Sequence, residues 1–153
     1  MEYIQSASGQ EQEGCVFCRL PDEGDDERVH ILTRGERGFV LLNAFPYNPG
    51  HLMVAPFRHS GDPEELDVEE LLELQRLLQE SIRALRAEMQ PHGFNIGMNL
   101  GRAAGAGIPD HLHWHVVPRW EGDSNFMPVI GQTKVLPELL DETYTRLGKH
   151  FGP

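Results

Sequence analysis

Three histidines alternate with apolar residues in the stretch DHLHWHVVPRW, at 110–120. They are His111, His113 and His115. Side chains alternate across a strand, so we expect the three imidazoles on one face and the residues between them in the core. Because burying three imidazoles in an apolar core is costly, that face should line a cleft. Neutral imidazole can bind a metal ion, or act as a nucleophile and acid–base catalyst.

A loop of small residues, NLGRAAGAG at 99–107, stands shortly before the histidines. Small residues such as Gly105 and Gly107 leave backbone N–H groups accessible, and Arg102 adds positive charge. Such a loop can hold phosphate oxygens. The pairing of this loop with the histidines favours catalysis on a phosphate.

The two cysteines, Cys15 and Cys18, form a single Cys-x-x-Cys motif near the N-terminus. One such motif can be half of a zinc site, a redox pair or two buried thiols. We do not expect a structural disulfide, because we expect the protein in the cytoplasm.

The remaining chain predicts the frame that holds these residues. Residues 28–45 read as two strands around a turn, and 51–56, 94–100 and the histidine stretch as three further strands. Asp67 and Glu70 have the spacing of a capping box at the start of a long helix over 67–90. Its predicted apolar face is Leu71, Leu74, Leu78, Ile82, Leu85 and Met89. A short helix should follow from about Pro137. These elements predict an α+β fold, in which the long helix covers an antiparallel sheet of about five strands.

Length and charge limit the class of protein. The chain has 153 residues, which suits one domain over 14–153, with a C-terminal extension from about 121 and a flexible tail over 1–13. The net charge of −11 argues against nucleic-acid binding. We found no apolar run long enough to cross a membrane and no secretory signal, so we expect a cytoplasmic protein.

The motif His-φ-His-φ-His-φ-φ, with φ apolar, resembles the signature of the histidine triad (HIT) family of nucleotide hydrolases and transferases. The stretches CVFC, NPGHLMVAPFRH and NIGMNLG extend the resemblance over about 14–120. The resemblance implies that His113 attacks the α-phosphate and forms a nucleotidyl-histidine intermediate. His115 would then contact the phosphate, and His51 would orient the other ring nitrogen of the nucleophile through the histidine network.

The resemblance also implies a nucleotide-binding set. Asn43 stands where the family usually has an acidic residue for the ribose, and Asn99 would bind phosphate or orient the site. The apolar slot for the base would be Val16, Phe17, Leu20 and Leu41, for which plain core packing is the alternative. Family members commonly form homodimers, which we also expect here.

Family branches with an N-terminal Cys-x-x-Cys imply a structural zinc site. The ligands here would be Cys15, Cys18, His59 and His111, a closed tetrahedral set. One alternative is a pair of reduced thiols with His59 at the surface. Another is a catalytic metal held by the three motif histidines.

The segment HVVPRWEGDSNFMPVIGQTKVLPELL resembles a bacterial subgroup associated with phosphorolysis of diadenosine tetraphosphate. Phosphorolysis needs a second anion site, for which the candidates are Arg102, Arg119, Ser124, Asn125 and Lys134. Ala106 and Gly107 stand where many hydrolytic members carry Gln or Ser, so the leaving group must be assisted differently. We therefore expect phosphorolysis or hydrolysis of a dinucleoside polyphosphate. The alternatives are a purine nucleoside phosphoramidase and a non-catalytic nucleotide-binding adaptor.

Overall fold

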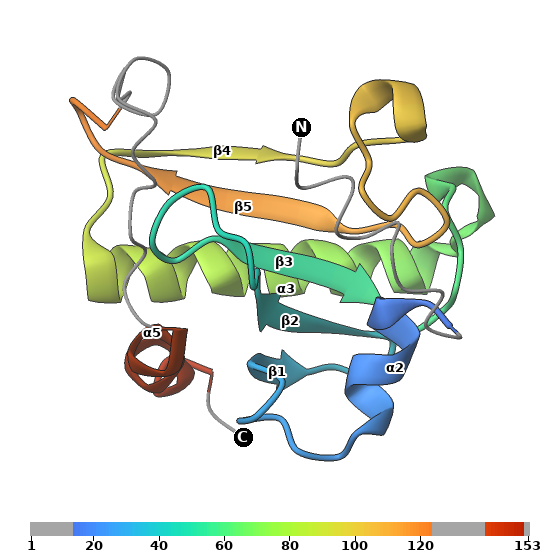
Figure 1. Cartoon of the computed structure of the whole chain (residues 1–153), viewed down its shortest axis with the longest axis horizontal. Coiled ribbons are helices and arrows are strands. Elements are labelled where there is room, and N and C mark those ends of the chain that lie inside the picture. Colours follow the sequence, from blue (N-terminus) through green and yellow to red (C-terminus); the bar gives the residue numbers. More distant parts are fainter. Residues whose placement is uncertain (1–13, 124–139, 152–153) are drawn as a thin grey trace.

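The computed structural model describes residues 14–123 and 140–151, which contain a five-stranded sheet (Figure 1). Its strands are β1 (Ile31–Arg34), β2 (Gly38–Leu42), β3 (Leu52–Pro56), β4 (Gly93–Gly97) and β5 (Trp114–Arg119). The order across the sheet is β1-β2-β3-β5-β4, and all neighbouring strands are antiparallel. The predicted α+β fold with an antiparallel sheet is confirmed.

The long helix α3 (Val68–Met89) begins with the predicted capping box. The Asp67 carboxylate accepts from the backbone N–H of Glu70 at 2.8 Å, and the Glu70 carboxylate accepts from that of Asp67 at 2.9 Å. Its buried face differs slightly from the prediction. Leu71 is 43% exposed, whereas Leu77 is buried. The spacing of the apolar residues was predicted correctly, but the helix is rotated so that Leu77 faces the sheet and Leu71 does not.

A close approach between α3 and the β1–β2 turn fixes the helix on the sheet. A side chain at Gly38 would collide with the Leu74 side chain at 2.8 Å and with the Ala55 carbonyl at 2.9 Å. The Glu73 carboxylate also accepts hydrogen bonds from the backbone N–H groups of Arg37 and Gly38. Glycine is therefore required where the helix meets the hairpin.

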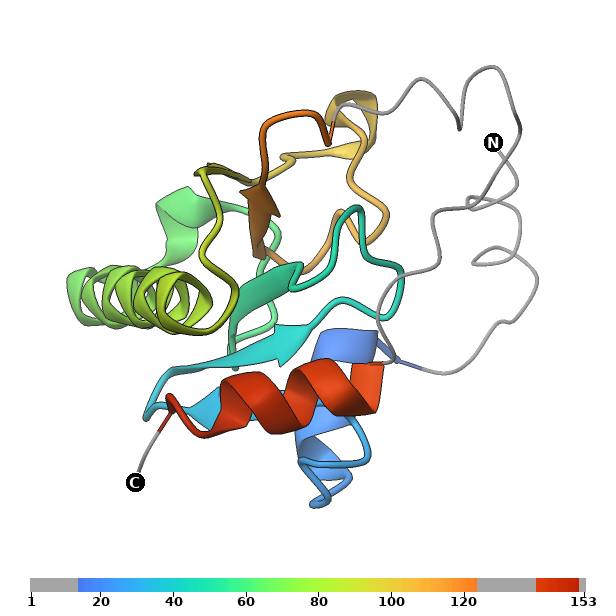
Figure 2. The same cartoon turned by 90° about the vertical axis from the view of Figure 1, so that its left-hand side faces the viewer.

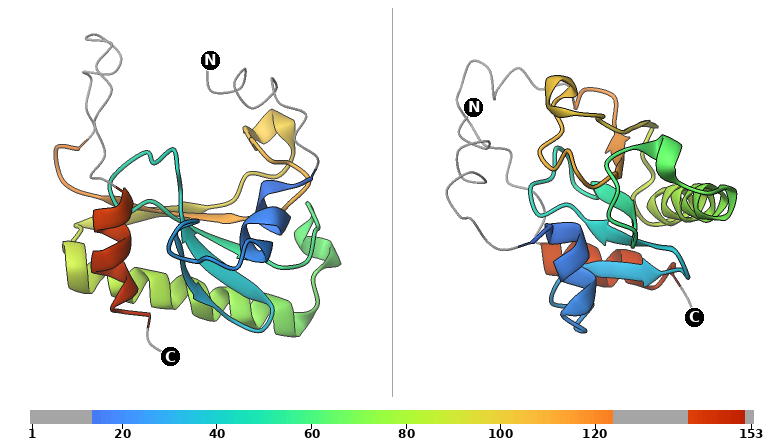
Figure 3. Two further views of the ribbon diagram at one scale, coloured as in Figure 1. Left: turned by 60° about the horizontal axis from the view of Figure 1, so that its bottom comes forward. Right: turned by 90° about the vertical axis from the view of Figure 1, so that its right-hand side faces the viewer.

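Two apolar clusters cover the two faces of the sheet. The larger one packs α3 against β2, β3 and β5, and also takes in Leu147 and Phe151 from the C-terminal segment. The smaller one joins α2 (Val16–Asp22) to the opposite face through Phe17, Leu41 and Met53. Figure 3 shows α2 and the 43–51 loop on the face opposite α3. In Figure 2, α5 (Leu140–Gly148) lies beside β1, with which it is in contact.

Some of the predictions fall partly or wholly outside the described residues. The short C-terminal helix is present as α5, but its predicted start at Pro137 lies outside the described residues, as do the 1–13 tail and Ser124, Asn125 and Lys134. Within the described ranges, no helix combines the length and apolar composition that crossing a bilayer requires. Two short 3-10 helices, η1 (Pro63–Glu65) and η2 (Arg102–Ala104), complete the elements.

Candidate active site and metal-ligand cluster

The three motif histidines do not all lie in a strand. β5 begins at Trp114, so His111 and His113 belong to the segment that leads into it. The alternation nevertheless persists, because Leu112 and Val116 are buried in the α3-side core and Trp114 packs against it. Each histidine has a different environment, which separates their chemical roles.

His111 lies in a cluster with the two cysteines and His59. Its Nδ1 is 3.3 Å from Cys15 Sγ and 3.5 Å from Cys18 Sγ, and His59 Nδ1 is 3.4 Å from Cys18 Sγ. The four ligand atoms all lie within 4.8 Å of one another. Ligands of a tetrahedral zinc ion at about 2.0–2.3 Å would be separated by roughly 3.3–3.8 Å, so the cluster is close to that geometry.

A backbone contact fixes which nitrogen of His111 faces the cluster. His111 Nε2 is 2.9 Å from the Pro56 carbonyl oxygen, which can only accept, so Nε2 carries the proton. Nδ1 is therefore the unprotonated nitrogen, and it faces the two sulfurs. Histidine ligands of metal ions are commonly held in this way, with the second nitrogen donating to a carbonyl.

His113 is oriented by the backbone of His111. Its Nδ1 lies 2.9 Å from the His111 carbonyl oxygen and must donate to it. In the neutral ring, Nε2 then carries the lone pair, which is the nucleophilic position. Burial lowers the pKa of His113, although the hydrogen bond to the carbonyl opposes this shift. At neutral pH the ring is therefore neutral, with its proton on Nδ1, and Nε2 is competent to attack.

His51 and His115 form a second, separate pair. The backbone N–H of Tyr47 donates to His51 Nδ1 at 3.1 Å, so Nε2 of His51 carries the proton and donates to His115 Nδ1 at 3.0 Å. His115 Nε2 then carries a proton in the neutral ring and can donate to a phosphate oxygen. We expected His51 to act on His113 through the histidine network. Its hydrogen bond is to His115, whose ring lies next to that of His113.

The His51–His115 pair stays neutral because it is shielded from water. His51 is only 1% exposed, and burial, with smaller effects of His115 and His113, lowers its pKa to about 3. Burial and His113 lower the pKa of His115 to about 4. The ring centroids of His113 and His115 are 4.9 Å apart, close enough for both rings to contact one ligand.

The residues expected for the base and the ribose lie near the histidines. Phe17 and Leu41 are 2% and 1% exposed, and the Phe17 ring centroid is 4.7 Å from that of His113. Both belong to the smaller apolar cluster, against which Val16 and Leu20 also pack. The side-chain oxygen of Asn43 accepts from the backbone N–H of Phe45, and its nitrogen lies 3.5 Å from the His51 ring nitrogens.

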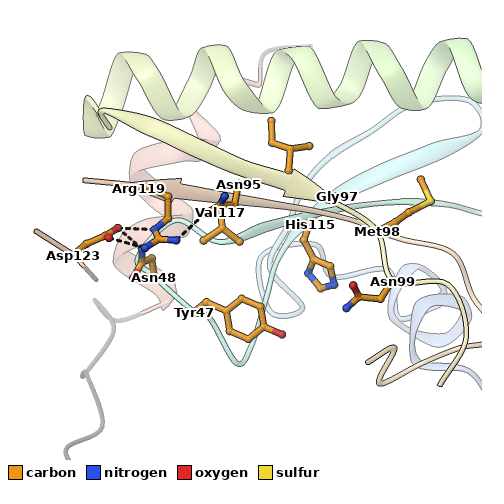
Figure 4. Close-up of a pocket in the computed structure, with 11 residues that line it drawn as sticks. Tyr47, Asn48, Asn95, Gly97, Met98, Asn99, His115, Val117, Arg119 and Asp123 are labelled. Atoms are coloured by element: carbon orange, nitrogen blue, oxygen red, sulfur yellow. Dashed lines mark hydrogen bonds and ion pairs between the residues drawn. The ribbon is translucent and has the colours of Figure 1, made fainter. Parts of the chain in front are cut away.

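The small-residue loop forms the 3-10 helix η2, which is followed by a turn that contains Gly105 and Gly107. Gly105 ends η2 with a φ of 88°, a left-handed conformation that favours glycine. Gly105, Gly107 and Arg102 are exposed, but the backbone N–H groups of Ala104, Gly105 and Ala106 donate within the loop, to the carbonyls of Gly101 and Arg102. Arg102 lines a different hollow from the one beside His115. Asn99 precedes the loop and points toward His115 (Figure 4).

A cavity of about 500 Å³ opens beside His115. Gly97 and Asn95 of β4 and Val117 of β5 line it from the sheet, and Tyr47 lies opposite (Figure 4). Arg119 is at the far end. Its guanidinium donates twice to Asp123, at 2.7 Å each, and once to Asn95 at 2.7 Å.

Comparison with known proteins agrees with this geometry. A family model described as the HIT domain matches residues 26–122. The chain belongs to the HIT family. Over 136 residues it is 46% identical to a Mycobacterium tuberculosis protein named AP-4-A phosphorylase, covering 89% of this chain and 69% of the relative. Among HIT structures, a Zn-bound histidine triad family protein from Mycobacterium smegmatis matches with a TM-score of 0.72 and 26% identity, over 90% of this chain and 92% of the other. A hypothetical histidine triad nucleotide-binding protein from Sulfolobus tokodaii matches with a TM-score of 0.69 and 27% identity, over 89% and 88%.

Sequence reasoning missed the aromatic residue at the centre of this HIT site. Tyr47 supplies the backbone donor for His51, and its ring centroid lies 4.8 Å from that of His51. The only available signal was its position four residues before His51, in the turn PYNPG. Asn48 was also missed; its side chain donates to Asp123 and to the Pro118 carbonyl, which ties the 43–51 loop to the end of β5.

Proposed function

We propose that this chain is a nucleotide phosphorylase that cleaves dinucleoside polyphosphates, with His113 as the nucleophile. One observation carries the proposal: the hydrogen bond from His113 Nδ1 to the His111 carbonyl, which leaves the Nε2 lone pair free beside His115. The 46% identity to a protein named AP-4-A phosphorylase supports diadenosine tetraphosphate as the substrate.

The first step is attack of His113 Nε2 on the α-phosphorus. An N–P bond forms, the bond from phosphorus to the bridging oxygen breaks, and ATP departs with the electron pair of that bond. The nucleophile becomes a positively charged nucleotidyl-imidazolium. Its proton stays on Nδ1, and the hydrogen bond from this N–H to the His111 carbonyl oxygen stabilises the charge. His115 Nε2–H, held by His51, donates to a non-bridging phosphate oxygen.

The second step returns His113 to its starting state. An oxygen of inorganic phosphate attacks the phosphorus, the N–P bond breaks, and ADP is released with the electron pair returning to Nε2. With water as the acceptor, the product would be AMP. Asn99, which points toward His115, can contact the entering anion, and His115 serves both steps.

A product assay tests this function directly. Diadenosine tetraphosphate is incubated with the protein, with and without inorganic phosphate, and the nucleotides are separated by chromatography. We expect ADP and ATP only when phosphate is present, and no turnover by His113→Asn. AMP and ATP independent of phosphate would indicate hydrolysis, and cleavage only of a P–N substrate would indicate a phosphoramidase. Unchanged turnover by a correctly folded His113→Asn protein would refute the mechanism.

We also infer that Cys15, Cys18, His59 and His111 hold a structural zinc ion. Their donor set of two sulfurs and two imidazole nitrogens suits zinc, and the Pro56 carbonyl already fixes His111 in the ligand tautomer. Burial and the neighbouring Cys15 raise the pKa of the Cys18 thiol, so two thiolates need a cation between them. When bound, the ion would link α2 and His59 to the segment that contains His111 and His113.

Metal analysis of the purified protein tests the zinc site. We expect about one zinc per chain in the wild type and a loss in Cys15→Ser, with a lower melting temperature for the variant. His92→Ser is a suitable control, because His92 is an exposed histidine outside the cluster. Retention of full zinc content by Cys15→Ser would refute this ligand set.

We further propose that the chain forms a homodimer. Three apolar residues at the start of α3, Val68, Leu71 and Leu72, are 74%, 43% and 49% exposed. β4 is an edge strand whose Ile96 is 40% exposed. Edge strands and apolar helix faces are surfaces that association covers. Light scattering should give the mass of two chains, and Leu72→Glu should reduce it; one chain at all concentrations would refute the dimer.

A further inference from the structure

The cavity beside His115 has no role in the two chemical steps, yet it adjoins the group that contacts the phosphate. We propose that it binds the second nucleoside of the dinucleoside polyphosphate, the one that leaves with the departing nucleotide. This inference rests on the proposed function, because it assigns a place to one part of that substrate.

The strand order places this cavity away from the first nucleoside. Phe17 packs against His113 and joins the cluster over β1, β2 and β3. The cavity lies over β5 and β4, on the other side of the histidines. Asn95, Gly97 and Met98 line it, whereas Phe94 packs against the core on the side of α3. A substrate with a nucleoside at each end of a phosphate chain can therefore occupy both sides of the histidine row.

The lining suits a nucleoside, which is neutral and partly aromatic. The Tyr47 side chain faces His51 but is 69% exposed, so much of its ring remains available to stack on a base. Val117 adds apolar surface. Arg119 pairs with Asp123, so the far end carries no net charge from these two residues. A phosphate would gain little there, whereas hydroxyl groups and ring nitrogens could bond to the amides of Asn95 and Asn48.

The dimensions are also adequate. A volume of about 500 Å³ is within the usual range of roughly 300–1,000 Å³ for small-molecule sites. His115 and Arg119 are four residues apart on one strand face, which corresponds to about 13 Å. That length leaves room for phosphate beside His115 and a nucleoside beyond it.

A substitution at Gly97, which lines the cavity from β4, would place a side chain inside the cavity. A side chain at this position would meet no atom within 4 Å, and its backbone conformation is an ordinary extended one. Gly97→Val therefore narrows the cavity, and Gly97→Ala narrows it less. Gly93→Val is the matched control, because Gly93 lies in the same strand, has equally open space and does not line the cavity.

Binding is measured by calorimetry in the His113→Asn background, which prevents turnover. The ligands are diadenosine tetraphosphate and AMP, which lacks the second nucleoside. We expect Gly97→Val to raise the Kd of diadenosine tetraphosphate at least about tenfold, and that of AMP by less than about twofold. Gly97→Ala should give an intermediate change, and Gly93→Val none. Melting temperatures of all variants check their folding.

Each other outcome overturns the assignment. A parallel rise for both ligands would place the first nucleoside in the cavity, and no change for either would leave the cavity unused. Failure of the parent His113→Asn protein to bind diadenosine tetraphosphate would also overturn it. Failure of the proposed function is seen separately, as absence of turnover by the wild type, because the binding comparison needs no catalysis.

Discussion

Acid destabilisation of the native protein should depend on His51, which is buried as a neutral ring. Its pKa falls from 6.5 to about 3 on folding, so the unfolded chain binds a proton between these values and the native protein does not. The associated stability is complete above pH 6.5 and is lost progressively as the pH falls toward 3. Between pH 8 and pH 5 the loss from this one residue is about 2 kcal/mol.

Replacement of His51 by Gln isolates this contribution. Glutamine can accept from the Tyr47 N–H and donate to His115, the two contacts that His51 makes, but it does not titrate. Urea unfolding at pH 8 and pH 5 should therefore show a stability loss about 2 kcal/mol smaller in the variant than in the wild type. The contributions of His115 and the cysteine cluster are present in both proteins and largely cancel. Equal losses in the two proteins, within about 0.5 kcal/mol, would refute the assignment of a buried neutral His51.

Three further predictions concern the frame around the site. Asp67→Ala removes the side-chain half of the capping box and should cost about 1 kcal/mol of unfolding free energy, measured with urea. Leu74→Ala, at a 1% exposed position, should cost about 2–5 kcal/mol, whereas Leu71→Ala, at a 43% exposed position, should cost clearly less. Similar costs would contradict the observed helix orientation. Glu88 accepts hydrogen bonds from Arg146, Lys149 and His150, so Glu88→Gln should lower the melting temperature at low salt, and the difference should shrink near 1 M salt.

Features that depend on neighbouring residues could be predicted from the sequence. The capping box of α3 needs only Asp67 and Glu70 at the correct spacing, and it is present. The five strands follow from short apolar runs bounded by glycine and proline, and all five were found. The cluster of Cys15, Cys18, His59 and His111 also agrees with the expectation, but that expectation came from the family resemblance.

Features that depend on tertiary contacts could not be predicted in the same way. α2 has seven residues, about two turns, which is too short for an apolar period to appear. The exposure of Leu71 depends on how far α3 is rotated on the sheet, a matter decided by the contact at Gly38. Tyr47 looks like an ordinary turn residue until the 43–51 loop is folded over His51. The hydrogen bond from His51 to His115 likewise joins two segments that are far apart in the chain.

His111 connects the metal-ligand cluster to the nucleophile through two parts of one residue. Its side chain lies beside the cysteines, and its carbonyl oxygen accepts a hydrogen bond from His113 Nδ1–H. Any rotation of the backbone at this residue would therefore move the carbonyl that holds the nucleophilic tautomer. With Nε2 bonded to Pro56 and Nδ1 beside the two sulfurs, both ring nitrogens are restrained, and the peptide that follows is restrained with them. A cluster that takes no part in the bond-breaking steps can in this way determine whether the nucleophile is correctly aimed.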